Sequence, residues 1–161
     1  MKITYLGLGS NLGDRRRHLE DAIGRLESPD VRVRRASSIY ETEPRDVADQ
    51  PWFLNQVIEA ETSLFPRQLY ARAKKIERDL GRRPSFPKGP RAIDIDILLF
   101  GEAIVSTPAL EIPHPRMAER RFVLEPLAEL VPELKHPLTR RTVREMLAQV
   151  RDQAIRQFHP D

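Results

Sequence analysis

Hydrophobic residues recur along the chain at two spacings, one typical of strands and one typical of helices. Apolar residues that alternate with polar ones, or that form short continuous runs, predict strands at residues 2–9, 31–44, 53–64 and 91–100. Apolar residues three or four positions apart predict helices within residues 10–28, 65–81, 116–130 and 139–153. A short edge strand is expected near residues 103–106. Several strands are too close in sequence for a crossover helix, so the pattern predicts an α+β fold with a mixed or antiparallel sheet.

Residues that favour helix starts and stops mark two of these helices. Asp14 stands where it can cap the helix of residues 10–28. Pro66 suits the first turn of the next helix, and Gly81 is a typical C-terminal stop. The glycine-rich segment 7–13 matches neither a dinucleotide-binding fingerprint nor a P-loop, so we interpret it as a tight turn and helix cap without a catalytic role.

The composition is that of one globular domain, expected to span residues 1–161. With 40% hydrophobic and 32% charged residues, the chain is long enough to bury a core. It contains no cysteine, which excludes disulfides, thiolate metal sites and cysteine nucleophiles. No apolar run approaches the roughly 18 residues that a membrane span needs, and the N-terminus lacks a signal-peptide pattern. We therefore expect a cytoplasmic protein with no membrane partner.

The net charge of +3 conceals a strong preference for arginine, because only five of the 27 basic residues are lysines. The planar guanidinium group matches pairs of phosphate oxygens, which favours a phosphate-rich ligand or a nucleic acid. For most of these arginines we prefer a simpler explanation, a GC-rich genome or the surface ion pairs of a thermophile. Charge alone therefore does not select a function.

Two aspartates interrupt the strand predicted at residues 91–100. Asp94 and Asp96 are two positions apart, so they share one face of the strand, with Cβ atoms about 6–7 Å apart. Two carboxylates on a partly buried face repel each other unless a cation lies between them. Oxygen ligands suit Mg²⁺, and paired ions about 3.5–4 Å apart are usual in displacement at phosphorus. We interpret the pair as a Mg²⁺ site for a polyphosphate; a solvated edge strand is the alternative.

Basic residues lie near this pair in the sequence. Arg91 begins the same strand, and a loop with Arg82, Arg83 and Lys88 precedes it. Positive charge around the phosphates is what phosphoryl transfer requires of a protein. For Arg82 and Arg83 the alternative is an interaction with the dipole of the preceding helix. A second basic segment, residues 113–122, places His114 between two prolines and favours a further phosphate or nucleotide contact.

Five motifs resemble one known family in their order and spacing. They are GSNLGD at 9–14, YETEP at 40–44, DQPWFLN at 49–55, KGPRAIDIDILLF at 88–100 and PHPRMAERRFVLEPLAEL at 113–130. Together they resemble the 6-hydroxymethyl-7,8-dihydropterin pyrophosphokinases of folate biosynthesis over almost the whole chain. The resemblance implies a monomeric, ferredoxin-like α/β/α sandwich with a mainly antiparallel sheet. It also implies transfer of the pyrophosphoryl group of MgATP to the hydroxymethyl oxygen of 6-hydroxymethyl-7,8-dihydropterin, with release of AMP.

The resemblance further implies roles for single residues. Asp94 and Asp96 match the aspartates that hold two Mg²⁺ ions on ATP, and Arg82 and Arg91 match basic residues on the phosphates. Further ATP contacts would be Glu77, Ile97, His114 and Arg120. The pterin contacts would be Thr42, Pro44, Phe53, Asn55 and Phe122, with the two phenylalanines stacking on the ring and Asn55 reading its edge.

The chain departs from the family pattern in places. Residues 82–90 read RRPSFPKGP where many relatives have a longer loop with RWGP, and Lys74 stands where some have glutamine. Two other functions are compatible with the residues, a Mg²⁺-dependent nucleotidyltransferase and a basic RNA-binding α+β module. The aromatic content of 6% and the low net charge argue against RNA, so we expect no nucleic-acid partner.

Overall fold

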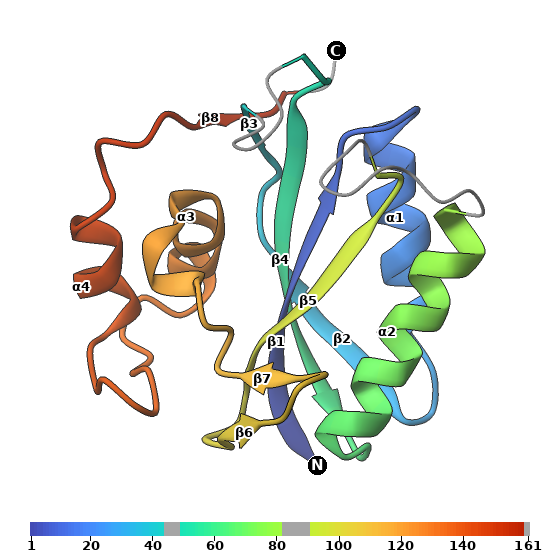
Figure 1. The fold of residues 1–161 in the computed structure, drawn as a ribbon, viewed down its shortest axis with the longest axis vertical. Coiled ribbons are helices and arrows are strands. Elements are labelled where there is room, and N and C mark those ends of the chain that lie inside the picture. The colour runs from blue at the N-terminus through green and yellow to red at the C-terminus, as the bar shows by residue number, and fades with distance from the viewer. Residues whose placement is uncertain (44–48, 82–90, 160–161) are drawn as a thin grey trace.

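The computed structural model describes residues 1–43, 49–81 and 91–159. Its main sheet contains β1 (Lys2–Ser10), β2 (Val31–Ala36), β3 (Tyr40–Thr42), β4 (Phe53–Thr62), β5 (Asp94–Phe100) and β8 (Arg156–Gln157). The strands lie in the order β5-β1-β4-β3-β8, β2 also pairs with β4, and every pairing is antiparallel. Long β4 is therefore the strand on which β1, β2 and β3 are assembled (Figure 1).

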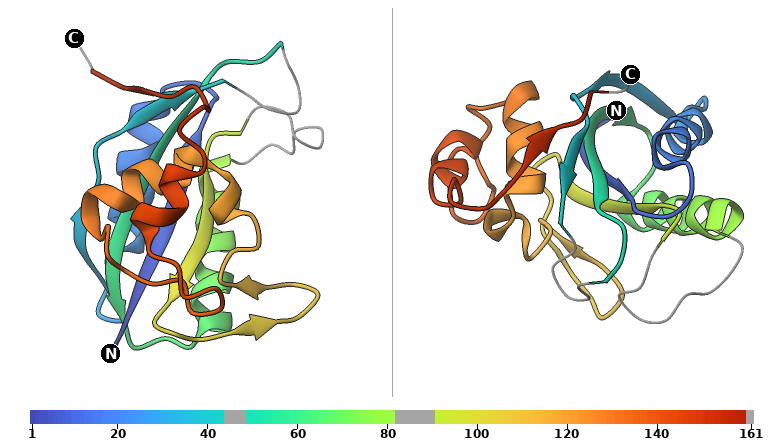
Figure 2. Two further views of the ribbon diagram at one scale, coloured as in Figure 1. Left: turned by 90° about the vertical axis from the view of Figure 1, so that its left-hand side faces the viewer. Right: turned by 90° about the horizontal axis from the view of Figure 1, so that it is seen from above.

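Helices cover both faces of this sheet. Helices α1 (Arg15–Leu26) and α2 (Pro66–Gly81) lie on one face, and α3 (Arg121–Leu130) and α4 (Val143–Ala148) on the other (Figures 1 and 2). Each layer has its own apolar core, one around Leu19, Leu69 and Ile95 and the other around Leu98 and Leu124. The predicted α/β/α sandwich with an antiparallel sheet is confirmed. None of the helices in the described residues has the length and apolar character that crossing a bilayer would require.

Strands buried on both faces explain why parts of the sequence are continuously apolar instead of alternating. In β5, Ile97 and Phe100 pack into the core under α1 and α2, and Leu98 and Leu99 pack into the core under α3 and α4, which buries the whole run from Ile97 to Phe100. Asp14 caps α1, as predicted, by accepting a hydrogen bond of 3.2 Å from the backbone N–H of Arg17.

The prediction of one continuous strand at residues 31–44 is wrong in one respect, because the chain forms two strands there. Both β2 and β3 pair with β4, but residues 37–39 leave the ladder. The Ser37 hydroxyl accepts the Val57 N–H at 3.0 Å and donates to the Ser38 carbonyl at 2.8 Å. A side chain thus replaces a backbone partner, and β3 restarts at Tyr40.

The C-terminal third of the chain contains three further differences. The strand expected near 103–106 is β6 (Val105–Ser106), which pairs with β7 (Glu111–Ile112) in a separate two-stranded sheet. The helix expected at 116–130 begins as a 3₁₀ turn, η1 (Met117–Glu119), before α3. The last helix is only Val143–Ala148, since the N–H groups of Gln149 and Val150 bond three residues back. Its predicted inward residues Val143, Met146, Leu147 and Val150 are nevertheless buried, as expected.

Candidate active site

Two glycines of β1 lie between the two sets of candidate residues. The register places Gly9 opposite Asn55 of β4 on one side and opposite Asp94 of β5 on the other. Gly7 is paired in the same way with Val57 and Asp96. Because glycine has no side chain, the middle strand leaves a depression between its two neighbours. Gly7 and Gly9 lie in β1, as the strand predicted at residues 2–9 requires, so the interpretation of residues 7–13 as a turn and helix cap holds only for the part after Ser10.

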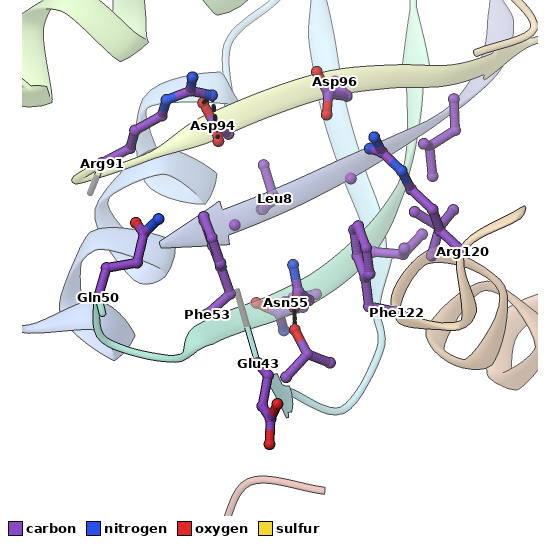
Figure 3. A pocket seen from close by; sticks show the side chains of 17 residues that line it. Leu8, Glu43, Gln50, Phe53, Asn55, Arg91, Asp94, Asp96, Arg120 and Phe122 are labelled. Atoms are coloured by element: carbon purple, nitrogen blue, oxygen red, sulfur yellow. Dashed lines mark hydrogen bonds and ion pairs between the residues drawn. The ribbon is translucent and has the colours of Figure 1, made fainter. Parts of the chain in front are cut away.

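A pocket of about 190 Å³ lies over this depression (Figure 3). Its walls come from β3, β4, β5, the start of α3 and the segment just before β4. The structure brings together eight of the residues proposed from the sequence: Thr42, Phe53, Asn55, Arg91, Asp94, Asp96, Arg120 and Phe122. Proposed residues Pro44 and Arg82, like Arg83 and Lys88, lie outside the described residues.

Asp94 and Asp96 form one side of the pocket, called the carboxylate wall below, and bring two acidic side chains close together. Asp96 is exposed, whereas Asp94 is partly buried and receives two contacts from Arg91 Nη1, at 3.2 and 3.3 Å. Burial raises the pKa of Asp94 to about 6; Arg91 opposes this shift, and the charges of Asp96 and Glu77 add to it. One nearby arginine therefore does not compensate the negative charge gathered here, which is the condition that favours a bound cation.

Two more cationic or polar groups lie close to Asp96. The Arg120 guanidinium lines the pocket and lies 5.5 Å from the centre of the Phe122 ring. Half-buried His114 accepts the Arg116 N–H at Nδ1, so its neutral ring carries the proton on Nε2. Burial lowers the pKa of His114; the nearby arginines act in the same direction and Asp96 opposes them. His114 is thus a neutral donor near the carboxylate wall.

Glu77 and Ile97 lie on the other side of β5. Glu77 accepts the Ile95 N–H at 2.7 Å and the Lys74 ammonium at 3.0 Å, which satisfies a backbone donor on the edge strand. Ile97 is 5% exposed and belongs to the core under α1 and α2. Neither side chain lines the pocket, so their proposed ATP contacts stay predictions for a separate surface beside it.

The opposite side of the pocket, called the neutral wall below, is formed by uncharged side chains: Thr42, Phe53, Asn55 and Phe122. Phe53 and Phe122 lie on either side of Asn55 in Figure 3. The buried Asn55 side chain accepts a hydrogen bond of 2.8 Å from the Thr42 hydroxyl, which fixes its amide orientation. Its NH₂ group is thereby directed away from Thr42 and toward Gly9. A flat heterocycle with polar edges fits such a wall.

Some pocket residues were not identified from the sequence. Glu43 and Gln50 line the pocket; both belong to motifs of the family resemblance, which implies no role for either residue. Buried Asn11 joins the two walls: its NH₂ group donates to the Gln50 Oε1 and the Pro51 carbonyl, and its Oδ1 accepts the Arg91 N–H. Its place in the GSNLGD motif was the only available signal, and that motif had been interpreted as a turn.

The sequence matches a family model described as 7,8-dihydro-6-hydroxymethylpterin-pyrophosphokinase (HPPK) over residues 5–132. The chain belongs to this family. An HPPK relative from Aquifex aeolicus, 2-amino-4-hydroxy-6-hydroxymethyldihydropteridine pyrophosphokinase, is 41% identical over 90% of each chain. Its namesake from Bacillus subtilis is 46% identical over 85% of this chain and 83% of its own. The predicted family is therefore confirmed.

Other HPPK relatives are longer proteins. The folic acid synthesis protein fol1 of Pneumocystis carinii is 40% identical over 98% of this chain, which spans only 21% of that relative's length. The crystal structure of the Plasmodium falciparum HPPK-DHPS with pteroate has a TM-score of 0.76 at 17% identity. The structural match covers 92% of this chain and 44% of the Plasmodium chain. At 17% identity, it supports the fold alone.

Gly9 gives a first test of the pocket in this HPPK chain. A Cβ atom at this position would lie 3.3 Å from Asn55 Nδ2 and 3.6 Å from a ring carbon of Phe53. Gly9→Ala is expected to raise the KM for the pterin about tenfold by displacing the neutral wall. The matched control is Gly24→Ala in α1, where no atom lies within 4 Å of the added Cβ. Equal pterin KM values for the two variants would contradict this placement.

Asp94→Asn is expected to stabilise the metal-free protein while weakening Mg²⁺ binding. Since the pKa of Asp94 is raised from its ordinary 3.8 to about 6, the free-energy cost of its charge in the folded state builds up between these two pH values and is complete above about pH 6. The melting temperature should therefore exceed that of the wild type at about pH 8, and the difference should narrow toward about pH 5. Calorimetry should show wild-type Mg²⁺ affinity falling as pH drops through about 6. A lower melting temperature for the variant at high pH would refute the charge argument.

Proposed function

We propose that this pocket is the active site at which the pyrophosphoryl group of ATP is transferred to the hydroxymethyl oxygen of 6-hydroxymethyl-7,8-dihydropterin. The observation that carries the proposal is the register of three strands, which sets Asn55 and Asp94 on either side of Gly9. An aromatic, amide-bearing wall suited to a pterin thus faces a carboxylate wall suited to a metal-bound triphosphate. Family membership supports this class of reaction, and the two unlike walls of the pocket support separate positions for the two substrates.

The carboxylate wall fits a magnesium site. Within the described part of the chain, no group of three or more His, Cys, Asp or Glu side chains is placed to hold a metal ion. Mg²⁺ needs only one or two carboxylates, because water and substrate phosphates fill its other positions. Asp94 and Asp96 would hold two such ions with ATP, which neutralise charge on the phosphates. The raised pKa of Asp94 supports this assignment, since its charge lacks full compensation.

The cationic side chains would orient the triphosphate. Arg91 and Arg120 line the pocket on either side of Asp96, and both guanidinium groups can donate in pairs to phosphate oxygens. His114 would add one neutral N–H donor through Nε2. With Glu77, Ile97 and Arg82, these residues make up the ATP side of the proposal. Their shared task is to hold the β-phosphorus in line with the attacking oxygen.

The neutral wall would orient the acceptor. Phe53 and Phe122 would stack on the two faces of the pterin, and the Asn55 amide, held by Thr42, would bond its edge. Pro44, which lies outside the described residues, stays a predicted pterin contact. The hydroxymethyl oxygen would then form a bond to the β-phosphorus of ATP as the bond from that phosphorus to the α,β-bridging oxygen breaks. AMP leaves with that oxygen, and the hydroxyl proton passes to solvent.

The remaining expectations concern the protein as a whole. We infer a monomer that acts on two small molecules without a nucleic-acid partner, in the cytoplasm. Support for a monomer comes from the candidate site, because both of its walls are formed by described residues of one chain. A measurement of mass in solution tests the monomer directly.

Chromatography of the nucleotides formed from ATP tests the reaction class. Wild-type protein with Mg²⁺ is expected to produce AMP only when the dihydropterin is present. ADP as the product would indicate an ordinary kinase. Inorganic pyrophosphate with a nucleotide-linked pterin would indicate the nucleotidyltransferase alternative. Either result would reject pyrophosphoryl transfer.

A further inference from the structure

The C-terminal strand β8 lies against the neutral wall of the pocket, although it is outside residues 5–132, the part matched by the family model. β8 pairs with β3, with Arg156 opposite Glu41 and Gln157 opposite Tyr40. The Phe158 N–H extends this pairing by donating to the Ile39 carbonyl at 2.8 Å. The last described residues of the chain therefore border the short strand that carries Thr42.

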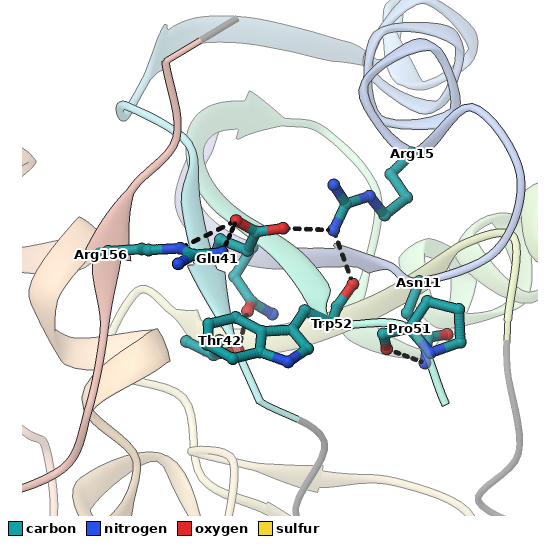
Figure 4. A network of polar contacts seen from close by, with 8 residues as sticks. Asn11, Arg15, Glu41, Thr42, Pro51, Trp52 and Arg156 are labelled. Carbon is teal, nitrogen blue, oxygen red and sulfur yellow. Dashed lines mark hydrogen bonds and ion pairs between the residues drawn. The ribbon is translucent and has the colours of Figure 1, made fainter. Parts of the chain in front are cut away.

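Glu41 connects β8 to the start of α1. Its Oε1 accepts hydrogen bonds from Arg156 Nε and Nη2, at 3.0 and 2.8 Å, and its Oε2 accepts one from Arg15 Nη1 at 2.7 Å. The Glu41 side chain is only 13% exposed. Burial raises the pKa of Glu41, but the two arginines more than offset this and hold it below its usual range. Glu41 is thus a charged bridge between two cations (Figure 4).

The same two arginines also contact Trp52. The Arg156 guanidinium lies 4.3 Å from the centre of the indole ring, close enough for a cation–π interaction. Arg15 Nη1 donates to the Trp52 carbonyl at 2.8 Å. Glu41 and Trp52 immediately adjoin Thr42 and Phe53, which are paired across β3 and β4 and line the pocket. The contacts of Arg156 therefore reach residues one position away from the neutral wall.

We propose that Arg156 is a positioning residue for the pterin, acting through Glu41 and Trp52 and not by contact with substrate. The inference rests on the proposed function for the identity of the ligand. Arg156 holds β3 and the residue before Phe53 together from outside the pocket. Without it, Thr42 and Phe53 lose a shared support, whereas Asp94, Asp96 and Arg91 on the far wall keep theirs.

If Arg156 contributed only to global stability, its replacement would have a different effect from the one expected of a residue that positions the pterin. The Arg156 side chain is 63% exposed, and the more buried Glu41 keeps its hydrogen bond from Arg15 when Arg156 is replaced, so the loss of global stability should be small. β3 also keeps its anchor to α3, where the Tyr40 and Ser38 hydroxyls donate to Glu129. Removing the guanidinium should therefore leave the fold intact while loosening one wall of the pocket.

The test compares Arg156→Ala with Arg156→Lys and with Arg144→Ala. The Arg144 side chain is 65% exposed, close to the value for Arg156, and it forms an ion pair with Glu133 at 2.6 Å, outside the pocket, so Arg144 is a control for the loss of an exposed guanidinium. Arg156→Ala is expected to raise the KM for the dihydropterin about five- to tenfold, with the KM for ATP changing less than about twofold. Arg156→Lys should be intermediate, since lysine keeps the charge but not the planar fork. Arg144→Ala should match the wild type.

The single tryptophan of the sequence adds a readout that needs no turnover. Emission from Trp52 in the free protein should change in Arg156→Ala and not in Arg144→Ala, because only the former removes a cation from the indole face. Unchanged emission, an unchanged pterin KM, or equal rises in both KM values would overturn the positioning role. Failure of the wild type to convert the pterin would instead overturn the proposed function.

Discussion

Replacing Asp96 with alanine is expected to lower kcat by roughly 1,000-fold or more, because it removes one of two carboxylates proposed to hold Mg²⁺ against the phosphates. Asp96 is exposed on β5, so its loss leaves no buried cavity. The melting temperature should stay within about 2 °C of the wild type. Steady-state kinetics and thermal unfolding on the same preparations provide both values.

The controls for this variant separate charge from general damage. Asp21→Ala removes an exposed aspartate on α1, outside the pocket, and should retain wild-type activity. Asp96→Asn keeps the shape of the side chain but not its charge, and should be as impaired as the alanine variant. Near-normal turnover by either Asp96 variant would rule out the proposed metal role.

The second large effect is expected at the neutral wall of the pocket. Phe122→Ala should raise the KM for the dihydropterin about 10- to 100-fold, as expected for loss of one ring that stacks on a heterocycle. The KM for ATP should rise less, although Arg120 lies against the same ring. Kinetics with each substrate varied in turn separate these two effects.

Phe122 also packs partly against the core under α3 and α4, so a rescue variant is needed. Phe122→Tyr keeps the stacking face and should restore the pterin KM to near wild type. Phe65→Ala is a matched control, because that phenylalanine is 73% exposed and lies outside the pocket. If alanine at position 122 left the pterin KM unchanged, the ring would belong to the core and not to the site.

Local patterns in the sequence were sufficient to predict most elements of the fold. Asp14 and Pro66 marked helix starts that the structure confirms, because capping and φ restriction act over a few residues; Gly81 is the last described residue of α2, so its role as a stop stays a prediction. The break at Ser37 was not predictable from alternation, since it depends on a side chain that bonds the backbone of a distant strand. The early end of α4 was not predictable either, because it depends on the Gln149 and Val150 N–H groups bonding three residues back instead of four.

The site was predictable in part for a similar reason. Asp94 and Asp96 share a face by strand geometry alone, and the family resemblance supplied partners from four other segments. The role of the two glycines was missed because it depends on register: only pairing with β4 and β5 shows that Gly9 separates Asn55 from Asp94. Asn11 was missed because its partners, Gln50 and Arg91, are distant in sequence.

The most direct test of the central claim is ³¹P NMR of the wild-type protein with ATP, Mg²⁺ and 6-hydroxymethyl-7,8-dihydropterin. The two walls of this pocket predict that AMP and a pterin diphosphate appear together as ATP disappears, which places the attack at the β-phosphorus. Appearance of ADP with a pterin monophosphate, or of pyrophosphate with a pterin-linked nucleotide, would contradict the proposed geometry. ATP left unchanged by folded protein would contradict the function itself.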